Sequence, residues 1–122
     1  VNVGQPVTLR ARILISEDLP ELVFGYVIKD RLGQQIYGTN THYLCLDLKQ
    51  LRKGELFTIS LSFPANIGVG SYSISTALHV AENHLSANYE WRDLALMFNV
   101  ININRETFVG VNWLPPHVEC VR

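Results

Sequence analysis

Alternation of apolar and polar residues runs through most of this chain and predicts strands. Its clearest stretch is FTISLSF at residues 57–63, where threonine and serine separate large apolar residues. A period of two places one set of side chains on a core and the other set on the opposite face of a sheet. The same alternation recurs at residues 7–15, 72–80 and 96–100. No segment shows a convincing helical period, so we expect no helix.

The stretch around which the rest is organised spans residues 24–41, FGYVIKDRLGQQIYGTNT. It predicts a β-hairpin, with a turn at residues 30–33 where Asp30 can accept backbone hydrogen bonds and Gly33 can adopt a positive φ. An isolated hairpin is marginal in water, so this one needs a second sheet to cover its apolar face.

The remaining segments complete a series of about eight strands. Residues 44–52 fit either a strand end or a short helical turn, residues 17–21 break the first strand, and residues 64–70 form a connection. Residues 82–91 are polar and irregular, whereas residues 108–113 form one more strand before two prolines. We therefore predict a single all-β domain over residues 1–122, an immunoglobulin-like antiparallel β-sandwich.

The G-x-Y-x-I pattern that begins at Gly70 sharpens this prediction. Immunoglobulin-type sandwiches carry a tyrosine at the start of one strand that ties the corner, two residues before a cysteine. Tyr72 occupies the tyrosine position and Ile74 the cysteine position, so the disulfide between the sheets is absent. The alternative is an ordinary tyrosine at the edge of the core.

Composition narrows the class of protein. Hydrophobic residues make up 48% of the chain and charged residues 17%, which excludes a disordered tail. The net charge is −1 and the basic residues are scattered, so we expect no nucleic-acid partner. Cys45 and Cys120 do not form a disulfide framework, and we expect both thiols to be free. Because the chain starts at Val1 without an initiator methionine, we expect it to be a piece excised from a longer protein.

Catalytic and metal-binding motifs are not convincing here. His79 and His84 are five residues apart in a predicted strand that then breaks, whereas a zinc-binding pair needs one helical turn between its histidines. Glu82, Glu90 and Asp93 have the chemistry of a glycosidase pair, but their context favours ordinary surface charge. We therefore predict no enzyme activity in this domain, no metal and no cofactor.

Binding is the remaining class of function. If three of the predicted strands are neighbours, their outward residues form a shallow polar face with short serines as its floor. A sugar needs planar donors and acceptors for its hydroxyls and an aromatic ring for its C–H surface. On this basis we predict a glycan site with outward-facing Ser73 and Ser75 in contact with solvent and an aromatic residue at the edge. The predicted site residues are Ser73, Ser75, His79, Lys29, Asn99, Tyr37 and Trp91. An ordinary exposed serine-rich face is the alternative.

Two blocks of the sequence resemble a known family. The first is F-G-Y-V-I-K-D-R-x-G-x-x-I-Y-G-x-N-T from Phe24, and the second is G-S-Y-S-I from Gly70, followed by Glu90-Trp91 and Phe98-Asn99-Val100. Together they resemble the C-terminal domain of the ATPase subunit of O-antigen polysaccharide ABC exporters, the Wzt type. The resemblance spans roughly the middle three-quarters of the chain.

The resemblance implies an immunoglobulin-like sandwich that binds the finished O-antigen glycan before export. It further implies a cytoplasmic location at the inner face of the bacterial inner membrane, a membrane transport subunit contacted through the ATPase part, and a homodimer. The apolar segment at residues 108–113 suggests that dimerisation can exchange a strand or pair two edges. The alternatives are a protein-interaction or adhesion module, or a carbohydrate-binding module of a secreted glycosidase.

Overall fold

The chain folds into seven β-strands and no helix within the described residues. The computed structural model describes the backbone of residues 1–83 and 86–122, and the side chains of residues 1–79 and 96–122. The strands are β1 (Pro6–Leu14), β2 (Leu19–Asp30), β3 (Gln35–Asn40), β4 (Leu48–Leu51), β5 (Leu56–Pro64), β6 (Gly70–Asn83) and β7 (Ser86–Val100). All named strand pairs are antiparallel, so the predicted all-β class is confirmed.

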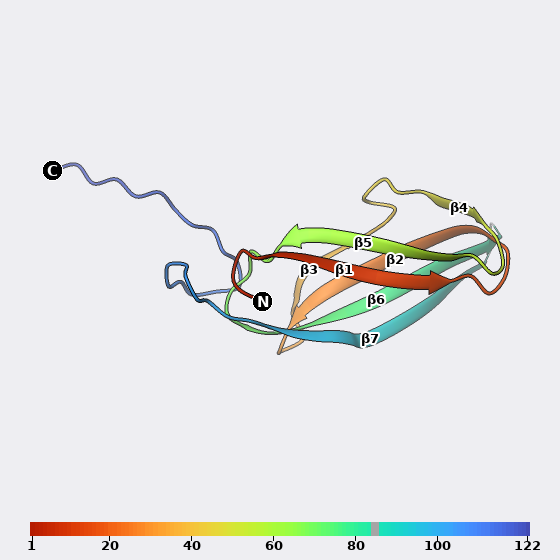
Figure 1. Ribbon diagram of the computed structural model, residues 1–122, viewed down its shortest axis with the longest axis horizontal. Coiled ribbons are helices and arrows are strands. Elements are labelled where there is room, and N and C mark those ends of the chain that lie inside the picture. The colour runs from red at the N-terminus through yellow and green to blue at the C-terminus, as the bar shows by residue number, and fades with distance from the viewer. Residues whose placement is uncertain (84–85) are drawn as a thin grey trace.

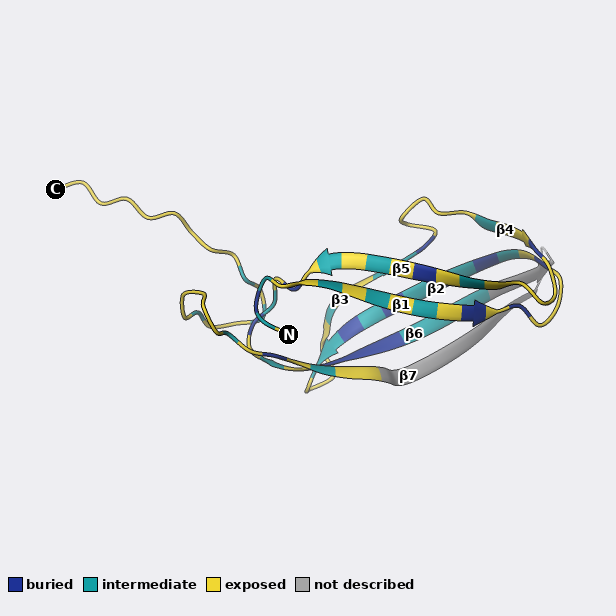
Figure 2. Ribbon diagram, viewed as in Figure 1, coloured by how far each residue is buried: buried dark blue, intermediate teal, exposed yellow. Residues whose placement is uncertain are grey.

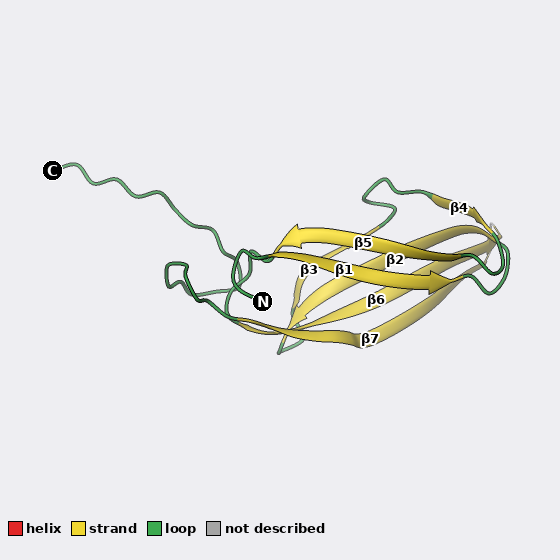
Figure 3. Ribbon diagram, in the orientation of Figure 1, coloured by secondary structure: helices red, strands yellow, loops and turns green. Residues whose placement is uncertain are grey.

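Two sheets of unequal size stack to form a sandwich (Figures 1 and 3). The larger sheet has the order β3-β2-β6-β7, and β4 pairs with the early part of β2. The smaller sheet contains only β1 and β5. The three strands that we expected to be neighbours, now β2, β6 and β7, do lie side by side in the larger sheet.

Several strand ends differ from the sequence prediction. The break predicted at residues 17–21 is shorter, because β2 already begins at Leu19 and pairs with β4 there. Pro20 is tolerated close to the start of the strand, where a missing N–H costs little. Of the polar stretch at 82–91 predicted to be irregular, the described residues 82–83 and 86–91 instead belong to the paired strands β6 and β7. The ambiguous residues 44–52 contain a turn followed by the short strand β4.

The core lies between the two sheets and consists of two apolar clusters (Figure 2). One is centred on Phe24 and Ile59, and the other on Tyr26, Tyr72 and Ile74. The even-numbered residues of β2 from Leu22 to Ile28 are buried and face this core, as period two requires. Two strands cannot cover a wider sheet, so Leu96 faces inward beside Ile74 but remains 48% exposed.

The tyrosine corner is present. The hydroxyl of Tyr72 donates a buried hydrogen bond of 2.7 Å to the carbonyl oxygen of Gly68, four residues upstream. Burial raises the pKa of Tyr72, and the negative charge of Asp30 raises it further. The neutral, hydrogen-bonding phenol is therefore the stable form in the fold. Tyr72 closes the corner in the way that the G-x-Y-x-I pattern indicated.

The hairpin turn is also as predicted. One carboxylate oxygen of Asp30 accepts hydrogen bonds from the backbone N–H groups of Leu32 and Gln34, both at 2.9 Å. Gly33 has a φ of 82°, a left-handed conformation that a residue with a Cβ rarely adopts. A bulge between Ile28 and Lys29 shifts the register of β3 against β2. This shift decides which way Tyr37 faces.

The C-terminal segment differs from the predicted last strand. Within residues 108–113, only an isolated bridge between Ile67 and Asn112 has strand character. The backbone there is clamped by hydrogen bonds from Gly68 N–H to the Val111 carbonyl (2.7 Å) and from Trp113 N–H to the Asn66 carbonyl (3.1 Å). Phe108, Val111 and Trp113 pack against the second core cluster of the same chain. Beyond Leu114 the chain extends away from the sandwich (Figure 1).

Candidate functional site

The floor predicted for the glycan site does not contact solvent. Ser73 and Ser75 do lie on the opposite face of β6 from buried Ile74, so the predicted direction is right. Their exposed fractions, however, are only 6% and 1%. Ser73 sits between Lys29 on β2 and Met97 on β7, and Ser75 sits beside Val27. Because serine is shorter than these neighbours, they screen it from solvent, and the expectation of an accessible serine floor is wrong.

The other predicted site residues are distributed over three places. Lys29, Asn99 and His79 share the outer face of the larger sheet, on β2, β7 and β6. Asn99 is tied to this face, because its side-chain oxygen accepts a hydrogen bond of 2.8 Å from the Ser71 hydroxyl. Tyr37 pairs with Ile28 and therefore faces the inner side, so it is not at the edge of the predicted site. The side chain of Trp91 lies outside the described residues, as do those of Glu82, His84, Glu90 and Asp93.

An open depression of about 260 Å³ occupies the outer face of the larger sheet near the end that carries His79. It is lined by Glu21, Val23, Asn40, His42, Tyr43 and His79. Val23 and His79 are direct cross-strand partners on β2 and β6. The adjacent row across the sheet is low, because Gly25 stands between Asn40 and Ala77. The depression thus has taller polar side chains beside a row of short ones.

A tight turn after β3 supplies the aromatic side of this depression. Thr41 anchors the turn, since its buried hydroxyl accepts a hydrogen bond of 3.1 Å from the Phe24 N–H. The side-chain oxygen of Asn40 accepts from the Tyr43 N–H at 2.8 Å, and the Leu46 N–H donates to the Thr41 carbonyl at 2.9 Å. These bonds fix the backbone while Tyr43 remains 74% exposed.

The chemistry of the depression combines the two kinds of group that a sugar requires. The Tyr43 ring is accessible, and the centroid of the neighbouring His42 ring lies 6.1 Å from it at an interplanar angle of 49°. The amide of Asn40, the carboxylate of Glu21 and the imidazole of His79 supply planar donors and acceptors. Of these residues, the sequence prediction contained only His79. For His42 and Tyr43 the signal was the T-H-Y triplet at the end of the predicted hairpin, just before the segment whose structure the pattern left ambiguous.

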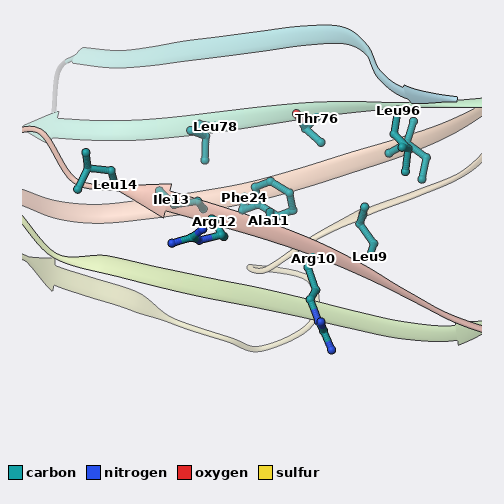
Figure 4. A pocket seen from close by; sticks show the side chains of 11 residues that line it. Leu9, Arg10, Ala11, Arg12, Ile13, Leu14, Phe24, Thr76, Leu78 and Leu96 are labelled. Atoms are coloured by element: carbon teal, nitrogen blue, oxygen red, sulfur yellow. The ribbon is translucent and has the colours of Figure 1, made fainter.

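Two larger hollows lie at the open sides of the sandwich. One of about 530 Å³ follows the free edge of β1, where Thr76, Leu78 and Leu96 point toward that strand while Arg10 points away (Figure 4). The other, of about 460 Å³, opens between β3 and β5 and contains Tyr37. Both hollows exist because the two-stranded sheet leaves the margins of the wider sheet uncovered.

Comparison with known proteins identifies the family. The model of the family described as "Wzt C-terminal domain" matches residues 1–114. A solved structure described as "Crystal structure of the C-terminal domain of wzt" superposes with a TM-score of 0.82 at 18% sequence identity. The match covers 99% of this chain and 73% of that one. No curated protein matches the chain.

The two comparisons support different statements. At 18% identity the structural match shows the fold, which is the antiparallel sandwich described above. The family match spans nearly the whole chain and supports a role related to O-antigen and ABC transport. The domain of this family is non-catalytic. Within the described residues, no helix is long and apolar enough to cross a membrane. The chain belongs to the Wzt C-terminal domain family.

Proposed function

We propose that this domain recognises the O-antigen polysaccharide through the depression on the outer face of the larger sheet. The glycan lies across this face, with one sugar ring against Tyr43 and its hydroxyls on Asn40, Glu21 and His79. Asn99 and Lys29 line the path of the chain farther along the same face. Recognition selects the finished glycan for export.

The observation that carries this proposal is the convergence of an exposed aromatic ring with amide, carboxylate and imidazole groups around one hollow. The depression is open and shallow, which suits a polymer that must enter and leave along its length. Each hydrogen bond to a sugar replaces one to water and nets only about 0.5–1.5 kcal/mol, so the affinity for the polysaccharide should be modest.

The cellular context is part of the same proposal. The domain acts at the inner face of the inner membrane, as the C-terminal part of an ATPase subunit that contacts the membrane transport subunit. Two copies act together. The side chains of Leu114, Val118 and Val121 are at least 80% exposed, and burial against a second copy would remove this apolar surface from water.

Affinity measurements with single variants test the proposed site. The probe is delipidated O-polysaccharide from the strain that encodes the chain, titrated calorimetrically into the domain. Tyr43→Ala should weaken binding at least about tenfold. Truncating one of the few residues that dominate an interface costs more than about 1 kcal/mol of binding free energy. His79→Ala should weaken binding without abolishing it. Leu32→Ala, at an exposed position in the distant hairpin turn, is the matched control and should bind as the parent does. Unchanged affinity in Tyr43→Ala would contradict this site.

A further inference from the structure

The cleft between β3 and β5 has the features of a ligand site distinct from the outer-face depression. Its volume of about 460 Å³ lies within the range of small-molecule pockets. Its lining is mostly aromatic and aliphatic, with a few polar residues. This margin of the larger sheet is not covered by β1 and β5, so the apolar lining of the hollow is accessible to a ligand.

Three aromatic rings line the cleft, two from the larger sheet and one from β5 of the smaller sheet. The ring of Tyr26 lies centrally, with its centroid 6.4 Å from that of Phe63 at an interplanar angle of 15°. The centroid of Tyr37 is also 6.4 Å from that of Tyr26, at an angle of 51°. Tyr37 is 55% exposed at the mouth, whereas Tyr26 is 5% exposed. The cleft thus offers apolar ring faces from exposed Tyr37 to buried Tyr26.

The phenol of Tyr26 is the polar group that points to a ligand. Tyr26 is 5% exposed and its hydroxyl makes no hydrogen bond within the described part of the chain, but this oxygen is not shut off from solvent there and opens into the cleft. Burial raises the pKa of Tyr26, and the neighbouring Tyr37 raises it further. The group is therefore a neutral hydroxyl that can donate one hydrogen bond and accept others. Because the hydroxyl faces the open cleft, a ligand hydroxyl can replace water as its hydrogen-bond partner.

One end of the cleft carries two exposed polar residues on hydrogen-bonded backbone. Asn66 and Asn112 line it, and the bridge between Ile67 and Asn112 joins the two segments that carry them. The hydrogen bond from Trp113 N–H to the Asn66 carbonyl fixes the same joint. Two amide side chains therefore stand near an apolar wall, an arrangement that suits a ligand with one polar and one apolar side.

From these features we propose that the cleft binds a single sugar unit that carries a methyl group, either a 6-deoxy methyl or the methyl of an acetamido group. The sugar ring stacks at Tyr37, its methyl group enters the apolar interior beside Phe63, and one hydroxyl pairs with Tyr26. The inference rests on the proposed glycan function, because it assigns the cleft a sugar. It is separate from that function in location, since the cleft lies between the sheets and the depression lies on the outer face.

Matched pairs of monosaccharides test this inference. D-fucose and D-galactose differ only in the 6-deoxy methyl group, and N-acetyl-D-glucosamine and D-glucose differ only in the acetamido group. Each is titrated into the isotopically labelled domain while backbone amide shifts are recorded. In at least one pair, the methyl-bearing sugar should bind about tenfold more tightly than its partner, the lower end for one methyl group in an apolar pocket. The shifts should cluster at residues 36–39, 61–67 and 112.

Tyr26→Phe separates binding from folding. Its hydroxyl has no partner in the described structure, so removing it should leave the melting temperature unchanged or higher while weakening the sugar at least about threefold. Tyr37→Ala, at the exposed mouth, should weaken the sugar further. Equal binding within both sugar pairs, shifts that cluster elsewhere, or full affinity in Tyr26→Phe would each overturn the inference.

Tyr43→Ala distinguishes this inference from the proposed function. It should leave monosaccharide binding in the cleft intact while weakening the polysaccharide. If the monosaccharides fail to bind but Tyr43→Ala still weakens the polysaccharide, only the cleft inference is overturned. If the methyl-bearing sugar binds in the cleft and Tyr43→Ala leaves polysaccharide binding unchanged, the outer-face proposal fails and the cleft inference stands.

Discussion

Alternation along β6 places residues on both faces of the larger sheet, and residues on both faces are screened from solvent, but by different parts of the molecule. On the inner face of β6, Tyr72 and Ile74 are 4% and 3% exposed because the smaller sheet covers them. On the outer face, Ser73 and Ser75 are 6% and 1% exposed because longer neighbours screen them. The accessible chemistry of the outer face therefore lies toward one end, around His79 and the turn that carries Tyr43. Facing outward and reaching solvent are separate properties, and only the second makes a binding site.

The largest expected effect comes from the inner face. Ile74→Ala removes a fully buried side chain from the second core cluster, so it should lower the free energy of unfolding by about 2–5 kcal/mol. Chemical denaturation measures this directly. A loss below about 1 kcal/mol would mean that the two faces are assigned the wrong way round, since a slip of one residue exchanges them.

Ser75 provides the contrast on the outer face. Ser75→Trp should lower the free energy of unfolding by about 1–3 kcal/mol, because the position is screened and has no room for an indole. Ser75→Ala is the matched control. The Ser75 hydroxyl has no hydrogen-bond partner in the described part of the chain, so its removal should leave stability unchanged or raise it by up to about 1 kcal/mol. A Ser75→Trp variant as stable as the parent would show that the serine row is open to solvent.

Tyr72 links the inner face to the corner of the sandwich. Tyr72→Phe keeps the ring but removes the hydrogen bond to Gly68, and it should lower the free energy of unfolding by about 1–3 kcal/mol. Thermal melts of the variant and the parent at pH 7 measure this. Equal melting temperatures would mean that the corner bond contributes nothing to the fold.

Alkaline pH produces a smaller effect with a definite sign. Tyr26 and Tyr72 both have raised pKa values, so the folded state keeps their protons more firmly than the unfolded chain does. Their contribution to stability is complete below about pH 10, the unfolded pKa of tyrosine, and it disappears as pH rises through the folded pKa values. Denaturation midpoints should thus fall above about pH 10, and less steeply in Tyr26→Phe. An identical slope in that variant would contradict the assignment of Tyr26.

The proposed dimer involves neither face of the larger sheet, so it should change least between variants of the two faces. Light scattering at tens of micromolar should show two copies. The segment beyond Leu114 extends away from the sandwich and exposes apolar side chains, which a second copy would bury. Shortening the chain after Leu114 should then yield a monomer with an unchanged melting temperature. A monomer of the full chain at that concentration would contradict the proposed assembly.

Much of the fold was predictable from the sequence because alternation reports the direction of each side chain. The hairpin turn, the tyrosine corner and the inner set on β6 followed from local pattern alone. The height of neighbouring side chains is not a local property, which is why Ser73 and Ser75 were expected to be accessible. The bulge beside Lys29 sets the register of β3, so no local pattern could show that Tyr37 faces inward.

The candidate site was harder to predict than the fold. His79 follows from its place on the outward side of β6, but Glu21 and Asn40 join it only through cross-strand pairing. Tyr43 depends on a turn in which Asn40 and Thr41 bond to the backbone, and such a turn interrupts any periodic pattern. Sites assembled from a turn and several strand ends therefore escape an analysis based on alternation.

The central claim is that the polysaccharide binds at the outer-face depression, and amide shift mapping tests it most directly. Delipidated O-polysaccharide from the encoding strain is titrated into the isotopically labelled domain. The account predicts that shifts cluster at residues 21–25, 40–43 and 77–79, and that Tyr43→Ala reduces them. Shifts confined to the opposite sheet, around Arg10 and Ser60, would contradict the claim, as would an unperturbed spectrum at saturating polysaccharide.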